Sequence, residues 1–215
     1  MGTYYDEPIL WRCVDIDENG PLMLSDKIIS IKPFDVGGDN ITKNSSQGRE
    51  SLRNKDGSNF WEDSNIRSWL NSTAKAGNVN WLCGNPPTAD KVWRGYNAYA
   101  DEKVFLADGN FTESERSVIK TVTQKSLLSR LDITMATSGN EIHVLNQNIE
   151  NVVQKYSSAY AHNVKDKMFP LDVKQLNSVY ENRSILGDSY YIGQPTQKAV
   201  DNSEYKSDEI TRGEN

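Results

Sequence analysis

The clearest structural signal in the chain is the segment Trp61-Glu62-Asp63-Ser64-Asn65-Ile66-Arg67-Ser68-Trp69-Leu70-Asn71. Ser64 is a preferred residue type at a helix N-cap. Ile66, Trp69 and Leu70 follow at the spacing of one apolar helix face. Because a tryptophan side chain buries roughly 150–250 Å² in a core, the segment predicts a short core helix over 64–71. The same spacing favours packing over ligand stacking for its aromatic residues.

Length and charge limit the classes of protein that fit this sequence. The chain has 215 residues, a net charge of −6 and a pI of about 5.0. Lysine and arginine are scattered, which argues against a nucleic-acid interface and against adhesion to anionic lipid. No apolar run reaches the roughly 18 residues of a membrane helix, and residues 1–6 lack the charged and apolar parts of a signal peptide. We expect a single domain over 1–215 without membrane insertion or nucleic-acid binding.

A β-hairpin is predicted over residues 8–28, with its turn at Asn19-Gly20. The turn overlaps a sequence that resembles a calcium-binding loop, in which the matching residues are Asp15, Asp17, Asn19, Gly20 and Asp26. The last position is aspartate where an EF-hand has glutamate, and no flanking helix is predicted. Aspartate, asparagine and glycine are also the residues that tight turns select. We therefore interpret the segment as a hairpin turn and predict no metal site.

Motifs of catalysis and cofactor binding are missing from the sequence. The two histidines and two cysteines have no zinc-ligand spacing, and no nucleophile elbow or phosphate-binding loop occurs. We predict no catalytic residues and no cofactor. Cys13 lies in an apolar strand pattern and is predicted to be buried, whereas Cys83 lies in a loop. A Cys13–Cys83 disulfide is possible, but neither the sequence nor a known compartment requires it.

Long loops separate the predicted elements. Residues 35–59 form a polar loop, and residues 72–103 form an aromatic-rich insertion with glycine and proline throughout. The candidate ligand-binding residues of this insertion are Trp81, Trp93, Tyr96 and Tyr99. Exposed loops often carry binding surfaces. The alternative, which we favour, is that these aromatic side chains hold the insertion against the body of the domain.

Two further helices are predicted from capping boxes. The first begins at Thr112 with Glu115 three residues later, and its apolar residues could extend a helical or mixed segment to about residue 131. The second begins at Asp172 with Gln175 three residues later, after a short predicted strand over 167–171. Its predicted buried face consists of Val173, Leu176, Val179 and Tyr180. The tail from residue 202 is polar, and we expect it to be loosely packed.

Four pieces of the chain together resemble a known family. They are Glu7 to Arg12 with Asp15 to Asp17 and Leu24 to Lys27; Trp61 to Asn71; Phe111 to Ile119; and Asp166 to Leu171 with Leu186 to Asp188. The family is an uncharacterised domain of Gram-positive bacteria and their phages, similar to the C-type-lectin-like fold of formylglycine-generating enzymes. The resemblance implies that the chain lacks the closing strands at its C-terminus and that 72–103 is an insertion. It supplies no catalytic residues.

The fold expected from these observations is α+β, with short antiparallel strands, two or three capped helices and long loops, and the resemblance adds that it is C-type-lectin-like and incomplete. The expected function is a non-enzymatic recognition module that binds glycan or protein at a bacterial cell surface or in a phage particle. Two alternatives stay open. One is an enzyme that acts on glycans, and the other is a purely structural domain of a larger surface protein.

Overall fold

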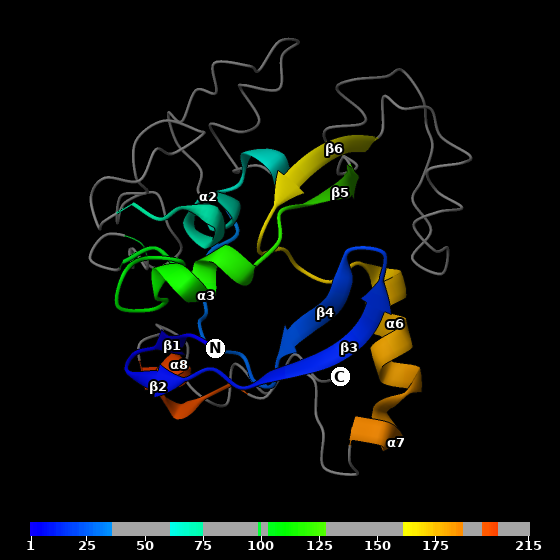
Figure 1. The fold of residues 1–215 in the computed structure, drawn as a ribbon, viewed down its shortest axis with the longest axis horizontal. Coiled ribbons are helices and arrows are strands. Elements are labelled where there is room, and N and C mark those ends of the chain that lie inside the picture. Colours follow the sequence, from blue (N-terminus) through cyan, green and yellow to red (C-terminus); the bar gives the residue numbers. More distant parts are fainter. Residues whose placement is uncertain (36–60, 75–98, 100–102, 128–160, 187–194, 202–215) are drawn as a thin grey trace.

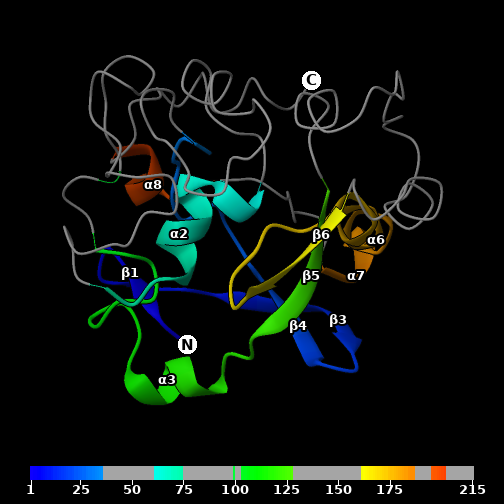
Figure 2. The same cartoon turned by 90° about the horizontal axis from the view of Figure 1, so that it is seen from above.

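The computed structural model describes residues 1–35, 61–74, 99, 103–127, 161–186 and 195–201. These residues form a mixed α+β structure of short antiparallel strand pairs and short helices (Figure 1). Turned by 90°, the same structure has η1 (Trp61–Asp63) and α2 (Asn65–Asn71) with α8 (Gln197–Asp201) on one side and α6 (Val173–Glu181) with α7 (Arg183–Leu186) on the other (Figure 2).

Three strand pairs are present in the described part of the chain, and each is an antiparallel two-stranded sheet. Strand β1 (Thr3–Tyr4) pairs with β2 (Glu7–Pro8). Strand β3 (Trp11–Asp17) pairs with β4 (Gly20–Ser25). Strand β5 (Val122–Leu127) pairs with β6 (Ala161–Asp166). The last pair joins segments that lie far apart in the sequence.

The helices are short. They are the 3-10 helix η1 (Trp61–Asp63) and the α-helices α2 (Asn65–Asn71), α3 (Glu113–Val118), α6 (Val173–Glu181), α7 (Arg183–Leu186) and α8 (Gln197–Asp201). The predicted helix starts are confirmed. The Ser64 side chain accepts a hydrogen bond from the Arg67 N–H, and capping boxes begin α3 at Thr112 and α6 at Asp172.

The predicted hairpin is confirmed as β3 and β4, but its turn lies one residue earlier than the predicted Asn19-Gly20. Asp17 pairs with Gly20, so the turn residues are Glu18 and Asn19, and Gly20 begins β4 with a φ of +107°. Glycine adopts this left-handed backbone without steric cost. The Asp17 Oδ1 accepts a hydrogen bond of 2.7 Å from the Asn19 N–H, which closes the turn with a side chain.

The core lies where α2 meets the N-terminal strands and the 103–111 segment. Trp69 is 3 % exposed, and its indole ring makes an edge contact with Tyr4 and a tilted contact with Phe105. The backbone also joins here, because the Phe105 N–H donates to the Trp69 carbonyl at 3.1 Å. The buried members of this cluster are Tyr4, Ile9, Trp69, Tyr99, Val104, Phe105, Leu106, Ala107 and Phe111. The predicted core role of the Trp61–Asn71 segment is therefore confirmed.

The segment expected to be helical or mixed to about residue 131 is mixed as far as residue 127, and residues 128–131 lie outside the described part of the chain. Helix α3 ends at Val118, and β5 begins at Val122. The residues Thr121, Val122 and Thr123 are all β-branched, which restricts their χ1 angles and favours a strand. The antiparallel pairing of β5 with β6, which begins nearly forty residues later, then satisfies the backbone of β5 as a strand.

The strand predicted over 167–171 is absent, and β6 ends just before it. The N–H groups of Lys167 and Met168 donate to the Asn71 side-chain oxygen at 2.8 and 3.0 Å instead of to a neighbouring strand. Pro170 has no N–H to donate. The backbone of this segment is therefore held by a side chain of α2 rather than by a sheet.

Two predictions of burial are wrong. Cys13 is exposed on β3, where the hairpin has no partner layer over that face within the described residues. In α6, Val179 is buried, but Leu176 and Tyr180 are exposed. Helix α6 lies at the side of the described body (Figure 1), so only a narrow face of it packs inward.

Glu115 connects the start of α3 to the N-terminal segment. Its carboxylate accepts hydrogen bonds from the Gly2 N–H at 2.8 Å, from the Thr112 N–H at 2.9 Å and from the Thr112 hydroxyl at 2.9 Å. These bonds, the Gly2 one first, lower the pKa of Glu115 from 4.5 to about 2. The carboxylate thus accepts one bond from outside its own helix.

Glu115 is expected to make stability pH-dependent. Because its pKa is lowered on folding, its contribution is fully present above pH 4.5 and is lost as the pH falls toward about 2. Urea unfolding midpoints of wild type and Glu115→Gln should differ above pH 4.5 and converge at the acid end. Glu113→Gln removes the neighbouring exposed acid of α3, which does not accept the Gly2 bond, and is the control for the loss of one negative charge from the start of this helix. A constant offset between wild type and Glu115→Gln at every pH would contradict this linkage.

Candidate functional site

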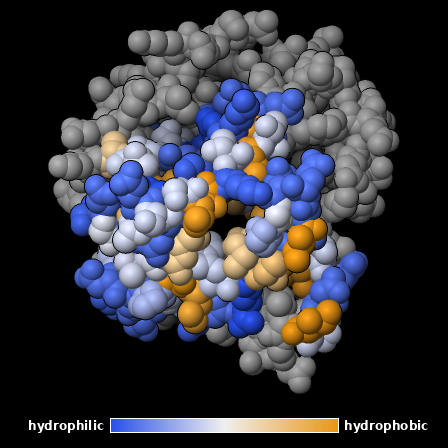
Figure 3. All heavy atoms as spheres, in the orientation of Figure 1, coloured by the Kyte–Doolittle hydropathy of each residue, from blue (hydrophilic) through white to orange (hydrophobic). Residues whose placement is uncertain are grey.

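A pocket of about 560 Å³ opens at the surface between the hairpin and the other described elements. Figure 3 shows a hollow near the centre of one face, with hydrophobic residues around it. One wall is β4, and the others come from α2, from the end of α3 with the start of β5, and from the segment between β6 and α6. A pocket of this size is in the range that binds ligands in proteins.

The lining is mostly apolar and includes aromatic and methionine side chains. They are contributed by Met1, Trp11, Leu22, Met23, Leu24, Ile29, Ile66, Trp69, Leu70, Phe105, Val118, Ile119, Val122, Met168, Phe169 and Leu171. The Trp11 indole is fixed, because its N–H donates to the Met1 carbonyl at 2.6 Å. Methionine side chains are flexible and polarizable, so they adapt to ligands of different shape.

Charged residues in the lining are mostly basic, although the chain as a whole is acidic. Lys32 lies over the Trp69 ring, with its Nζ 4.6 Å from the ring centroid. Lys120 donates from Nζ to the Asn19 carbonyl, and Lys167 donates from Nζ to the Arg116 carbonyl at 3.0 Å. Asp17 is the acidic member, and both of its carboxylate oxygens accept from Asn19. The pocket therefore combines an apolar wall with an excess of positive charge.

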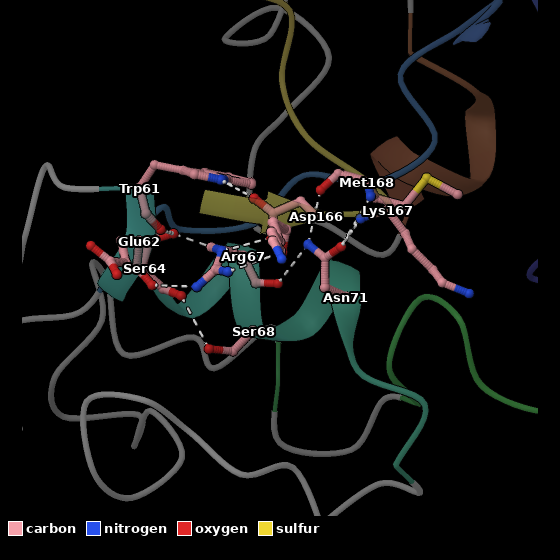
Figure 4. Close-up of polar contacts among 10 residues, drawn as sticks. Trp61, Glu62, Ser64, Arg67, Ser68, Asn71, Asp166, Lys167 and Met168 are labelled. Carbon is pink, nitrogen blue, oxygen red and sulfur yellow. Dashed lines mark hydrogen bonds and ion pairs between the residues drawn. The ribbon is translucent and has the colours of Figure 1, made fainter. Parts of the chain in front are cut away.

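A second polar cluster joins η1 and α2 to β6 (Figure 4). The Asp166 carboxylate is buried and accepts from the Trp61 indole N–H and from the Arg67 Nε, each at 2.8 Å. Arg67 also donates to the Glu62 carbonyl at 2.8 Å. Both carboxylate oxygens of Asp166 are thus engaged, as burial of a charge requires. The arrangement is that of a structural tie between distant segments.

Asn71 extends this tie by one helical turn. Its amide donates to the Met168 carbonyl at 2.8 Å, while its oxygen accepts from two backbone N–H groups of the same segment. The contacts hold the residues after β6 against the end of α2 (Figure 4). Because Met168 lines the pocket, the polar tie also positions one wall of the pocket.

The comparison with protein families assigns the chain to a family. Residues 19–209 match the model of a family described as a domain of unknown function, DUF6273. The chain belongs to the DUF6273 family. The search of curated proteins finds no match, and neither does the search of solved structures. Within the described residues of this DUF6273 domain, no helix is long and apolar enough to cross a membrane.

The residues of the calcium-like sequence are held by the hairpin itself. Asp17 accepts from Asn19, Asp26 forms an ion pair with Arg12, and the Asp15 Oδ1 accepts from the Ile16 N–H at 2.8 Å. Among the described residues of the DUF6273 domain, no group of three or more histidine, cysteine, aspartate or glutamate side chains could hold a metal ion. The carboxylates thus serve the turn and its strands.

Of the four candidate aromatic residues, the structure describes Tyr99. It is buried in the core, with its ring centroid 6.5 Å from that of Trp69, and its hydroxyl donates to the Pro33 carbonyl. This is the placement expected if the insertion is held against the body by its aromatic side chains. Trp81, Trp93 and Tyr96 lie outside the described residues, as does Cys83.

Sequence reasoning missed the pocket of the DUF6273 domain, although one signal for it exists. The residues Leu22, Met23 and Leu24 are consecutive and apolar, whereas a strand with one solvated face alternates apolar and polar residues. A continuous apolar run in a hairpin strand indicates contacts on more than one side. The lysines carried no signal, because their place at the pocket depends on how distant segments pack.

Proposed function

We propose that this DUF6273 domain is a non-enzymatic recognition module that binds a glycan or protein at a bacterial cell surface or in a phage particle. The proposal includes a C-type-lectin-like arrangement, which rests on the resemblance of the sequence. The ligand site is the apolar pocket beside β4. The single observation that carries the proposal is this pocket of about 560 Å³, open to solvent and lined by tryptophan, phenylalanine and methionine side chains.

The physical argument is that an open apolar cavity is costly unless something fills it. Apolar surface contributes roughly 25 cal/mol per Å² when it is removed from water. Ligand sites typically combine such a lining with a few polar groups that fix orientation. The lysines and Gln124 and Gln175 supply these groups here. The hydrogen bonds of the Trp11 indole and of the Met168 backbone described above hold these two parts of the lining in place.

The proposal can be tested by blocking the pocket. Val118 lines the pocket and is 67 % exposed, so Val118→Trp should fill space at the pocket without disturbing the core. Ile16 is 73 % exposed and lies outside the lining, so Ile16→Trp is the matched control. Wild type and both variants are applied to an array of bacterial glycans and to a panel of bacterial surface and phage proteins.

We expect wild type and Ile16→Trp to bind the same targets, and Val118→Trp to lose them. Equal melting temperatures of the three proteins show that the loss is not unfolding. Binding that survives in Val118→Trp would place the ligand elsewhere and would remove the support for this site. If wild type bound no target on either the glycan array or the protein panel, the recognition function itself would be overturned.

A further inference from the structure

The pocket runs along one edge of β4. All six residues of β4, from Gly20 to Ser25, line the pocket, whereas β3 contributes only its end residues Trp11 and Asp17. Successive side chains of a strand point to opposite faces. A cavity against one face of the hairpin would therefore contact alternate residues of both strands. Contact with every residue of β4 places the cavity beside the edge that faces away from β3.

That edge of β4 has no strand beside it in the described part of the chain. The sheet is two-stranded, and β3 is its other member. Figure 1 shows β4 on the inner side of the hairpin, toward α3 and β5. An unpaired edge presents backbone N–H and C=O groups that an extended chain can satisfy, and Pro21 is the one residue of β4 without an N–H. Peptides bind to many proteins in this way, as an added strand whose side chains enter neighbouring pockets.

The wall opposite β4 suits the side chains of such a strand. It includes apolar residues from the end of α3, the start of β5 and the segment after β6, namely Val118, Ile119, Val122, Met168 and Phe169. An added strand would direct every second side chain toward one face of the hairpin. A sugar has no repeating backbone of N–H and C=O groups to pair along a strand, so the edge of β4 favours a peptide.

Positive charge in the pocket indicates an acidic group on that peptide. The Nζ atoms of Lys120 and Lys167 each donate to one backbone carbonyl, those of Asn19 and Arg116. An ammonium group has three N–H donors. Among the described residues, no carboxylate lies within ion-pair distance of either group. The lining contains three lysines and one acid, Asp17, so the local excess of charge is positive in a chain of net charge −6.

We propose that the pocket binds an extended peptide that pairs with the open edge of β4 and places an acidic side chain or terminal carboxylate beside Lys120 and Lys167. This inference rests on the proposed function, because it names the ligand class of the same pocket. Its partner is a protein segment of alternating apolar residues with one acid. A fatty carboxylate or a second copy of this chain could occupy the same space, and the experiment separates them.

The probe is an acetylated and amidated hexapeptide in which valine alternates with threonine and the last residue is glutamate. Its matched control carries glutamine in place of glutamate. Two further versions are N-methylated on the odd or on the even residues, because only one set of amides faces β4 in an added strand. Decanoate is the fatty-carboxylate probe. Binding to the 215-residue chain is measured by calorimetry, and the mass of the free protein by light scattering.

We expect the glutamate peptide to bind at least about tenfold more tightly than the glutamine peptide, as a charge-assisted hydrogen bond predicts. One of the two N-methylated versions should lose binding and the other should keep it. Lys167→Gln and Lys120→Gln should reduce the preference for glutamate, whereas Lys27→Gln, at an exposed lysine outside the lining, should not. Val118→Trp should bind none of the peptides, and Ile16→Trp should bind as wild type does.

Several results would overturn the inference. Equal binding of both N-methylated versions would show that the edge of β4 is not paired. Binding of decanoate but of no peptide would assign the pocket to a fatty carboxylate, and a dimer dissociated by Val118→Trp would assign it to a second copy. If no peptide binds, the peptide inference is overturned, but the recognition function stands if wild type still binds targets on the glycan array or protein panel that Val118→Trp loses. If wild type binds nothing there either, the recognition function is overturned as well.

Discussion

Arg67→Met is expected to destabilise the domain by about 3–5 kcal/mol, because it leaves the Asp166 carboxylate buried without its cation. The Asp166 side chain is 0 % exposed and that of Arg67 is 18 % exposed, so water cannot replace the lost partner at little cost. The measurement is the free energy of unfolding in urea for wild type and variant. The Trp61 indole still donates to Asp166 in the variant, but a single neutral donor does not balance the charge.

Two matched variants make this expectation specific. Adding Asp166→Asn to Arg67→Met removes the buried charge and keeps an oxygen acceptor for Trp61, so it should recover much of the loss. Arg12→Met removes the arginine of a more exposed pair, with side-chain exposures of 37 % and 16 %, and should cost only about 0–1 kcal/mol through that pair. An Arg67→Met protein no less stable than Arg12→Met would refute the assignment of Arg67 and Asp166 as a structural tie.

Trp69→Ala is the second large effect, with an expected loss of about 3–5 kcal/mol for truncating a core tryptophan. The substitution removes ring contacts to Tyr4, Tyr99 and Phe105 and the hydrogen bond from the indole N–H to the Lys103 carbonyl at 3.1 Å. For a chain of this size, each kcal/mol lowers the melting temperature by roughly 2–4 °C. Thermal unfolding followed by circular dichroism should therefore show a large drop or no folded protein.

Trp69→Phe is the control for this expectation. Trp69→Phe keeps an aromatic ring in the cluster, although it loses the indole hydrogen bond and part of the side-chain volume. Its loss of unfolding free energy should therefore be clearly smaller than that of Trp69→Ala. Trp69 also borders the pocket, and a cavity left by alanine would merge with it. An unchanged melting temperature in Trp69→Ala would mean that the ring is not part of the core.

The starts of the helices and the hairpin turn could be predicted because their chemistry is local. Ser64, Thr112 and Asp172 each accept a hydrogen bond from a backbone N–H three residues later, so a short window of sequence contains the whole interaction. The turn at Asp17 and Asn19 is local in the same sense. Such signals need no partner that is distant in the sequence, so they hold in the buried Ser64 cap as well as in the exposed Thr112 cap.

The β5–β6 pair and the candidate site could not be predicted, because their partners are distant in sequence. Trp61 and Asp166 are separated by 105 positions, and no sequence pattern near either residue indicates that it contacts the other. The strand that follows α3 pairs with β6, so the local apolar pattern after Val118 left a helical and a mixed segment both open. The burial of Cys13 was likewise predicted from its strand pattern, whereas burial depends on whether another layer covers that face of the hairpin.

The tie between α2 and β6 has a consequence for how the chain folds. A contact across about a hundred residues requires closure of a long loop before any of its hydrogen bonds can form, and the entropy of that closure is lost first. The bond between Gly2 and Glu115 spans 113 positions and has the same character. Chains rich in such long-range contacts fold slowly. The helix caps involve only residues close in sequence, so we expect them to form before the contacts of Asp166 with Trp61 and Arg67.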